Sequence, residues 1–316
     1  MTAEIGGLHH VTAITGDARG NLDFYTRLLG MRLVKKTVNQ DDVSAYHLFY
    51  ADALGSPGTD VTFFDWPHAA PNRPGAGTIG PIALRVQDEG ALAWWRERFE
   101  SARVPHGEID TSQGRASLDF SDPEGQRLRL VADGGVPGGK PWDASPVPAE
   151  AQVKGLDGVT ITEARPDLTR RFLEQLLGFR QVAEREIPGG GSEQVFEIGP
   201  GGPGTEVRMV GPSPASGRPG RGGVHHVAFR VPDDEAHEAW HDRLQSAGVG
   251  VTPIIDRFYF KSIYFREPGG VLFEIATDGP GFAADEPETS LGSRLALPPF
   301  LEPQRERIEA ALLPLG

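Results

Sequence analysis

The sequence predicts an α+β protein in which four βαβββ modules are paired into two halves. The first observation behind this prediction is an internal repeat with two offsets. Residues 81–104 align with residues 226–249 at an offset of 145, and residues 7–34 align with residues 155–182 at an offset of 148. The second observation is that strand-like and helix-like stretches alternate within each repeat. Numbered along the chain, module one, which contains residues 7–34, therefore resembles module three, which contains residues 155–182. Module two, which contains residues 81–104, resembles module four, which contains residues 226–249.

Module four shows the order of elements most clearly. The stretch HVAFRV at 226–231 alternates in polarity, as a half-buried strand does. A helix is predicted over 233–248, because this stretch begins with acidic residues and ends at a glycine. Its apolar stripe consists of Ala236, Trp240, Leu244 and Ala247. A hairpin with its turn at EPGG is predicted over 262–277.

Module one follows the same order. The stretch LHHVTAIT is predicted as a strand, and residues 19–29 are predicted as a helix that ends at Gly30. The stretches HLFYAD and DVTFFDW are predicted as the strands that follow. Glycine-rich stretches at 199–204 and 217–223 are expected to be loops, because no strand-to-helix pattern surrounds them.

These repeats set the expected domain boundaries. A segment rich in glycine and proline separates the two halves, and a tail follows the last module. The predicted N-terminal half spans 1–135 and contains module one at 7–67 and module two at 78–134. A linker at 136–152 leads to the C-terminal half at 153–280, which contains module three at 153–212 and module four at 223–279. A tail at 281–316 contains a short amphipathic helix.

Composition excludes several classes of function. The net charge is −13 and the sequence has no basic block, which argues against a nucleic-acid partner or an anionic membrane surface. The absence of cysteine excludes disulfides, iron–sulfur clusters and thiolate metal sites. No stretch reaches the length of a membrane span, and the first residues do not form a signal peptide. We expect a cytoplasmic protein whose metal ligands, if any, are imidazoles and carboxylates.

Two pairs of adjacent histidines begin strand-like stretches, in GLHHVT and in GVHHVAF. Neighbouring side chains on a strand point to opposite faces, so only one histidine of each pair can face the concave side of a regular strand. The apolar residues after His226 suit the face under a helix, which leaves His226 on the concave face. The same alternation places His10 and Glu274 on the concave face as well.

His10, His226 and Glu274 are therefore the predicted metal ligands. Two imidazoles and one carboxylate form the facial triad of non-haem Fe(II) oxygenases, which leaves coordination positions open for substrate and O2. A carboxylate facing a closed cavity is costly unless it is paired or bound to a metal. The corresponding positions in modules two and three are occupied by Pro81, Arg129 and Gly158. We therefore expect one metal cavity, shared by modules one and four.

Four stretches resemble a known superfamily. They are GLHHVT with the following LLG, GVHHVAF, PGGVLFEIATDGP and the tail LALPPFLEPQRERIEAALLP. Together they resemble the vicinal oxygen chelate superfamily, and within it the branch of hydroquinone-type ring-cleaving dioxygenases. The resemblance covers roughly residues 7–280. It implies two half-barrel domains and an extradiol-type dioxygenase that binds Fe(II) through the same three residues.

The resemblance also implies cofactors and partners. The expected metal is Fe(II), with Mn(II) compatible with the same ligands, and the expected partners are a small aromatic substrate and O2. A homo-oligomer is compatible with the sequence. Two alternatives stay open, namely a glyoxalase-type lyase or isomerase that uses Zn(II) or Ni(II), and a metal-free binding protein of the bleomycin-resistance type. Glyoxalase-type enzymes usually have four protein ligands, whereas this sequence supplies three.

Further candidate catalytic residues lie on the same segments. Ring cleavage needs groups that move protons near the metal. The candidates are His9, Thr12, His225, Arg257 and Tyr264. Arg257 would stabilise a phenolate, and Tyr264 would donate a hydrogen bond to a ring oxygen. The two histidines point away from the metal on a regular strand, so a role for them requires a local irregularity.

A competing motif occurs in the predicted helix of module four. The stretch HEAWH at 237–241 fits the H-E-x-x-H pattern of zinc sites. We expect His237 and His241 to face solvent beside the apolar stripe, which argues against a metal site there. His47, His68 and His106 are expected to be surface residues or to make local hydrogen bonds.

Overall fold

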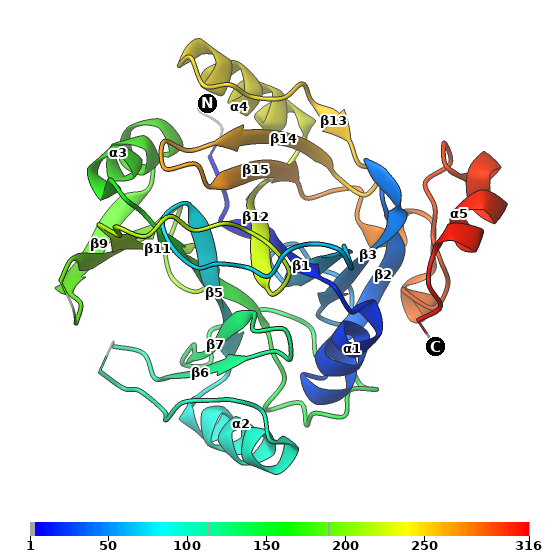
Figure 1. Ribbon diagram of the computed structural model, residues 1–316, viewed down its shortest axis with the longest axis horizontal. Helices are drawn as coiled ribbons and strands as arrows, with labels where there is room; N and C mark the ends of the chain where they lie inside the picture. Colours follow the sequence, from blue (N-terminus) through cyan, green and yellow to red (C-terminus); the bar gives the residue numbers. More distant parts are fainter. Residues whose placement is uncertain (1–3, 113, 189, 316) are drawn as a thin grey trace.

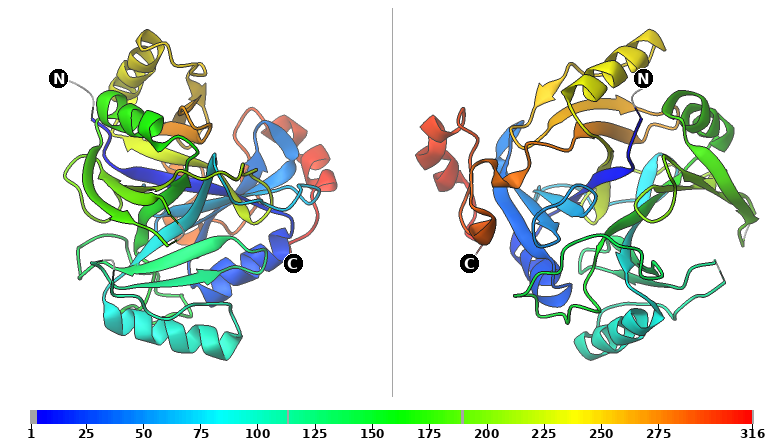
Figure 2. Two further views of the ribbon diagram at one scale, coloured as in Figure 1. Left: turned by 60° about the vertical axis from the view of Figure 1, so that its left-hand side comes forward. Right: turned by 180° about the vertical axis from the view of Figure 1, so that it is seen from behind.

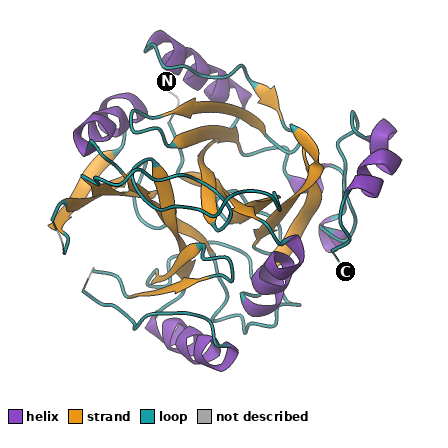
Figure 3. Cartoon of the chain, viewed as in Figure 1, coloured by secondary structure: helices purple, strands orange, loops and turns teal. Residues whose placement is uncertain are grey.

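The computed structural model describes residues 4–112, 114–188 and 190–315. The first three residues of the predicted N-terminal half and the last residue of the tail therefore lie outside the described residues. Within these residues, the strands form two curled sheets with the longer helices packed around the outside (Figures 1 and 3). The predicted α+β class and the paired modules are confirmed.

The eight-stranded sheet seen in the described residues combines the first and last quarters of the chain. It contains strands from residues 8–65 and from residues 223–277, joined by antiparallel pairing of β1 with β12. In spatial order the strands are β13 (Ile255–Asp256), β14 (Lys261–Arg266), β15 (Leu272–Thr277), β12 (Gly223–Val231), β1 (Leu8–Thr15), β4 (Asp60–Asp65), β3 (Asp42–Ala51) and β2 (Arg32–Asn39).

The seven-stranded sheet, counted over the same described ranges, combines the two middle quarters. The antiparallel pairing of β5 with β8 joins its two parts, as the pairing of β1 with β12 does in the other sheet. In spatial order the strands are β6 (Ser117–Ser121), β7 (Arg127–Ala132), β5 (Thr78–Val86), β8 (Gly155–Thr162), β11 (Glu206–Gly211), β10 (Ser192–Glu197) and β9 (Arg180–Glu186).

Each module contributes one helix to the outer layer (Figure 2). Helices α2 (Glu89–Ala102) and α4 (Asp234–Ser246) begin at aspartate caps, because Asp88 and Asp233 accept the backbone N–H groups three residues on. Trp240 and Leu244 of the predicted stripe are buried, whereas Ala236 is half-buried and Ala247 is exposed. Valine and phenylalanine side chains of β12 lie in the same apolar cluster, so burial of this face holds the helix on the sheet.

The helices of modules one and three are interrupted. Helix α1 (Ala18–Asp23) continues as a π-helical turn at Phe24–Leu28, and α3 (Pro166–Arg171) continues in the same way at Phe172–Leu177. Gly30 follows with φ +69, and a Cβ there would lie 2.5 Å from Ser145 Oγ. Glycine therefore ends this helix both by conformation and by space.

The tail packs along β2 and β3 and ends in helix α5 (Arg305–Ala311), which lies beside these strands in Figures 1 and 2. The ammonium group of Lys35 is fully buried and pairs with Asp285 and Glu286 of the tail. Phe282 packs against the ring of Phe49. The tail thus closes one side of the first sheet. No helix in the described part of the chain is long and apolar enough to cross a membrane.

Candidate metal centre

Three adjacent strands bring the predicted ligands together. His10 lies on β1, His226 on β12 and Glu274 on β15. The Nε2 atoms of His10 and His226 are 3.4 Å apart, and they lie 3.3 Å and 2.8 Å from Glu274 Oε2. The candidate ligand atoms all lie within 4.8 Å of one another, and no other such group of three occurs in the described residues.

The donor set fits a cation. All three side chains are buried, and Glu274 Oε2 has no hydrogen-bond partner among the described residues. The other carboxylate oxygen accepts a hydrogen bond from Ser262 Oγ. Burial alone would raise the pKa of Glu274, but its interactions with His10 and His226 hold this pKa well below its ordinary value. An ionised oxygen that faces two imidazoles, and has no partner apart from them, is a site that a divalent metal ion would satisfy.

Two β-bulges explain why the histidines occur in pairs. On β1, His9 is the extra residue between Leu8 and His10, and on β12 His225 is the extra residue beside His226. A bulge re-aims a side chain that a regular strand would point to the other face. The local irregularity that a role for His9 and His225 requires is therefore present in both strands.

Each bulge histidine contacts the histidine that follows it. His9 Nδ1 lies 2.9 Å from His10 Nδ1, and His225 Nδ1 lies 2.7 Å from His226 Nδ1. The second nitrogen of His9 lies 3.1 Å from the carbonyl oxygen of Thr277. Burial, followed by repulsion from the neighbouring histidine, lowers the pKa of both His9 and His225 to about 3. Both rings are therefore neutral at physiological pH.

A cavity adjoins the ligand trio. Its wall includes His10 and His226 together with aromatic side chains of β3, β4 and β14. Arg257 and Tyr264 line this cavity, as a substrate-contacting role requires. His9, Thr12 and His225 do not line it. The structure thus places the last three behind the ligands rather than in front of them.

Arg257 is held in place by Asp41, and Tyr264 lies close to the Arg257 guanidinium. The guanidinium of Arg257 makes two hydrogen bonds to Asp41, which lies in the turn between β2 and β3. It also lies 5.6 Å from the ring centre of Tyr264. Burial, followed by the charge of Glu274, raises the pKa of Tyr264 above its ordinary value. Tyr264 therefore keeps its proton and can donate a hydrogen bond.

Two histidine predictions were wrong in part. His237 is not exposed to solvent but fully buried, because its Nε2 lies 3.0 Å from the carbonyl oxygen of Ile275. His47 is not a surface residue, since it lines the cavity and contacts Thr62. The position of His47 depends on how β3 pairs with β4, and alternation along β3 alone does not reveal it. Neither residue belongs to the candidate metal group.

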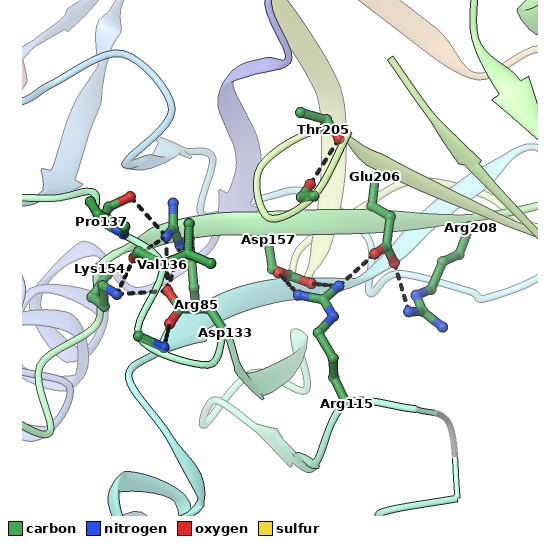
Figure 4. A network of polar contacts seen from close by, with 12 residues as sticks. Arg85, Arg115, Asp133, Val136, Pro137, Lys154, Asp157, Thr205, Glu206 and Arg208 are labelled. Carbon is green, nitrogen blue, oxygen red and sulfur yellow. Dashed lines mark hydrogen bonds and ion pairs between the residues drawn. The ribbon is translucent and has the colours of Figure 1, made fainter. Parts of the chain in front are cut away.

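The second sheet shows what replaces the ligands. Gly158 stands at the position of His10, and a Cβ there would lie 2.9 Å from the backbone oxygen of Glu206. The bulge residue is Asp157, which pairs with Arg115. Glu206 contacts the same arginine and also Arg208 (Figure 4). Ion pairs therefore occupy the positions beside Gly158 on the second sheet.

Two curled sheets with a group of two histidines and one glutamate define the class of protein, and comparisons with known proteins give the same class. The family model of the "Glyoxalase/Bleomycin resistance protein/Dioxygenase superfamily" matches residues 7–130 and 155–275. The chain belongs to this superfamily. Glyoxalase I from Zea mays has the same fold, with a TM-score of 0.63 and 16% identity over 86% of this chain and 92% of that chain.

Relatives with higher identity cover nearly the whole chain. MhqA of Bacillus subtilis, whose name marks it as a candidate ring-cleaving dioxygenase, is 45% identical over 99% of both chains. The chlorohydroquinone/hydroquinone 1,2-dioxygenase of Sphingobium indicum is 34% identical over 98% of this chain and 96% of its own. A crystal structure of a candidate dioxygenase from Bacillus subtilis superposes with a TM-score of 0.90 at 39% identity, covering 99% of this chain and 98% of that chain.

Proposed function

We propose that the chain is an Fe(II)-dependent dioxygenase that opens the ring of a hydroquinone or a related phenol with O2. The observation that carries the proposal is the buried trio of His10, His226 and Glu274, in which both imidazoles lie at one carboxylate oxygen, beside a cavity walled by aromatic side chains. The names of the full-length relatives support the same reaction. In the extradiol-type reaction that we propose, the broken C–C bond lies next to the carbon that carries the metal-bound oxygen.

Iron held by these three side chains would bind the phenol oxygen and O2 at its open positions. The remaining chemistry falls to residues of the chain. The protonated hydroxyl of Tyr264 faces the cavity and would donate a hydrogen bond to the ring oxygen near Glu274, its cross-strand neighbour. Arg257, held at the mouth by Asp41, would stabilise negative charge on the bound phenolate.

The bulge histidines would orient the ligands. A histidine that binds metal through Nε2 carries its proton on Nδ1. In His10 this proton would be donated to His9 Nδ1, and the proton on His9 Nε2 would be donated to the carbonyl oxygen of Thr277. His225 would accept the proton of His226 in the same way. Such outer contacts fix the tautomer and the ring orientation of metal ligands.

Oxygen consumption tests this proposal. Protein reconstituted with Fe(II) under anaerobic conditions would be mixed with hydroquinone, methylhydroquinone, chlorohydroquinone and catechol, followed by O2. We expect uptake of one O2 per ring and, with ¹⁸O2, two labelled oxygen atoms in the ring-opened product. Faster turnover of catechol would keep the dioxygenase and reject the hydroquinone preference. No uptake with any phenol, together with isomerisation of a hemithioacetal, would place the protein with the glyoxalase-type enzymes.

A further inference from the structure

A polar chain runs across three strands from His47, which lines the cavity, to Thr12, which lies two residues from the candidate ligand His10. His47 Nε2 on β3 lies 2.9 Å from Thr62 Oγ1 on β4, and Thr62 Oγ1 lies 2.9 Å from Thr12 Oγ1 on β1. Strands β1, β4 and β3 are neighbours in the sheet. His10 and His47 line the same cavity, so a ring bound there would lie beside both.

His47 presents a free nitrogen in an aromatic setting. Its ring centre lies 3.9 Å from that of Phe49 and 4.5 Å from that of Phe64, and both rings also line the cavity. Its Nδ1 makes no hydrogen bond with any described residue and is not sealed from the cavity. Burial, followed by repulsion from His10, lowers the pKa of His47 well below its ordinary value. The imidazole is therefore neutral and can either donate or accept at Nδ1.

Most of the other polar groups near the cavity are engaged, but Thr37, the cross-strand neighbour of His47, also lines the cavity, and its buried hydroxyl makes no hydrogen bond with a described residue. Both nitrogens of His9 are engaged, by His10 and by Thr277. The guanidinium of Arg257 is held by Asp41. Tyr264 lies at the metal end, because it is paired with Glu274 across neighbouring strands. His47, with Thr37 beside it, is therefore an available partner for a ring oxygen that does not bind the metal.

We infer that His47 hydrogen-bonds the substrate hydroxyl that points away from the metal, and thereby makes the site selective for para-diols. This inference rests on the proposed function. Thr62 holds the ring of His47 in place, and Thr12 holds the hydroxyl of Thr62. Because the two hydroxyls can reverse their donor direction, His47 can meet either a protonated or an ionised ring oxygen. A site built for a hydroxyl discriminates against an analogue that lacks it, because its own polar group is left unpaired.

Binding without turnover tests this inference. Protein loaded with redox-inert Zn(II) would be titrated by calorimetry, without O2, with hydroquinone and with phenol. We expect the wild-type dissociation constant for phenol to exceed that for hydroquinone by a factor of about ten or more. This ratio of the two dissociation constants is the quantity compared between variants. His47→Phe should reduce the ratio to about one by weakening hydroquinone binding alone. His47→Gln, which keeps a hydrogen-bonding group, should restore part of the ratio.

Matched variants separate the hydrogen bond from a general loss of structure. Thr62→Val should reduce the ratio partly, and Thr62→Ser should leave it near the wild-type value. His68→Phe changes an exposed histidine and should leave both affinities and the zinc content unchanged. A ratio that stays at the wild-type value in His47→Phe overturns the inference, as does a wild-type protein that binds both phenols equally.

Turnover assays distinguish failure of this inference from failure of the proposed function. If Fe(II)-loaded wild-type protein consumes no O2 but its binding preference depends on His47, the dioxygenase proposal fails and the binding role of His47 is supported. If O2 uptake occurs and His47→Phe keeps both the rate and the hydroquinone preference, the role of His47 fails and the dioxygenase proposal stands.

Discussion

The two sheets of this protein share a scaffold and differ in what lies on their inner faces. Each joins its two parts through a pair of antiparallel strands with two bulges. Each also places one arginine–aspartate pair at the corresponding position, Arg230–Asp278 in one sheet and Arg85–Asp133 in the other. Figure 4 shows the second of these pairs. One inner face carries two imidazoles and a carboxylate, whereas the other carries a network of opposite charges.

The difference shows that the curled sheet by itself does not make a metal site. The bulges are retained where no ligand is present, with Asp157 at the position that His9 occupies in the other half. A bulge therefore offers a position for a polar side chain, and the residue at that position decides whether it supports a ligand or forms an ion pair. Function lies in the residues placed on the fold rather than in the fold itself.

Removing the carboxylate of Glu274 should abolish metal binding, the property that distinguishes the eight-stranded sheet from the seven-stranded one. We expect Glu274→Ala to lose both bound Fe(II) and turnover to below detection, because two imidazoles alone complete no facial triad. Metal content after gel filtration and O2 uptake would be measured together. His241→Ala on α4 is the control and should retain both. Metal loss in His241→Ala but not in Glu274→Ala would move the site to the HEAWH motif.

Removing a bulge histidine should weaken the metal site without abolishing it. His9→Ala and His225→Ala should each lower metal affinity by about 10- to 100-fold, the usual effect of losing a group that orients a ligand. Competition with a chromogenic chelator would measure the affinities. Asp157→Ala, at the matching bulge of the other sheet, should leave them unchanged. Equal affinities in wild type and both histidine variants would contradict the orienting role.

Placing a ligand in the second sheet should fail. Gly158→His puts an imidazole at the position of His10, but the backbone of Glu206 leaves no space for its Cβ. We expect no added metal and a loss of about 1–3 kcal/mol in the free energy of unfolding. Denaturant titration would measure the loss. Gly250→His, where a Cβ meets nothing within 4 Å, is the matched control and should cost less.

A smaller comparison concerns two carboxylates near the turns of the sheets. Glu124 accepts hydrogen bonds from Thr15 and Gly16, whereas Glu163, which takes the position of Thr15 in the other half, is buried beside Glu267 and has no hydrogen-bond partner for its Oε1 among the described residues. Burial, followed by repulsion from Glu267, raises the pKa of Glu163 to about 8. A raised carboxyl pKa means that the folded state binds the extra proton, so stability is lost as pH rises from about 4.5 to 8.

Glu163→Gln should therefore stabilise the protein in alkaline solution only. We expect a gain on the order of 1 kcal/mol at pH 8 that disappears at pH 5, where the native carboxyl is already protonated. Unfolding curves at the two pH values would show the difference. Glu124→Gln should be destabilising at both, because it weakens the bonds from Thr15 and Gly16. A gain for Glu163→Gln that is equal at both pH values would contradict the assignment.

The sequence predicted the grouping of His10, His226 and Glu274 that the structure shows. Strand alternation selected His10, His226 and Glu274, and the repeat offsets showed that their counterparts are different residues. The bulges were not predictable in detail, since an extra residue in a strand appears only when the partner strand is known. His47 was misplaced for a similar reason, because its place in the cavity depends on the pairing of β3 with β4. His237 was misplaced because its buried carbonyl partner lies on β15, far along the chain.

Anomalous X-ray scattering at the iron edge, from crystals reconstituted with Fe(II), tests the central claim most directly. The account predicts one strong anomalous peak per chain, within coordination distance of His10 Nε2, His226 Nε2 and Glu274 Oε2. No peak should lie beside Gly158 and Arg129 in the second sheet. A peak on that sheet or at His237 and His241, or none at the three predicted ligands, would contradict the assignment of a single metal centre to the sheet that joins the two ends of the chain.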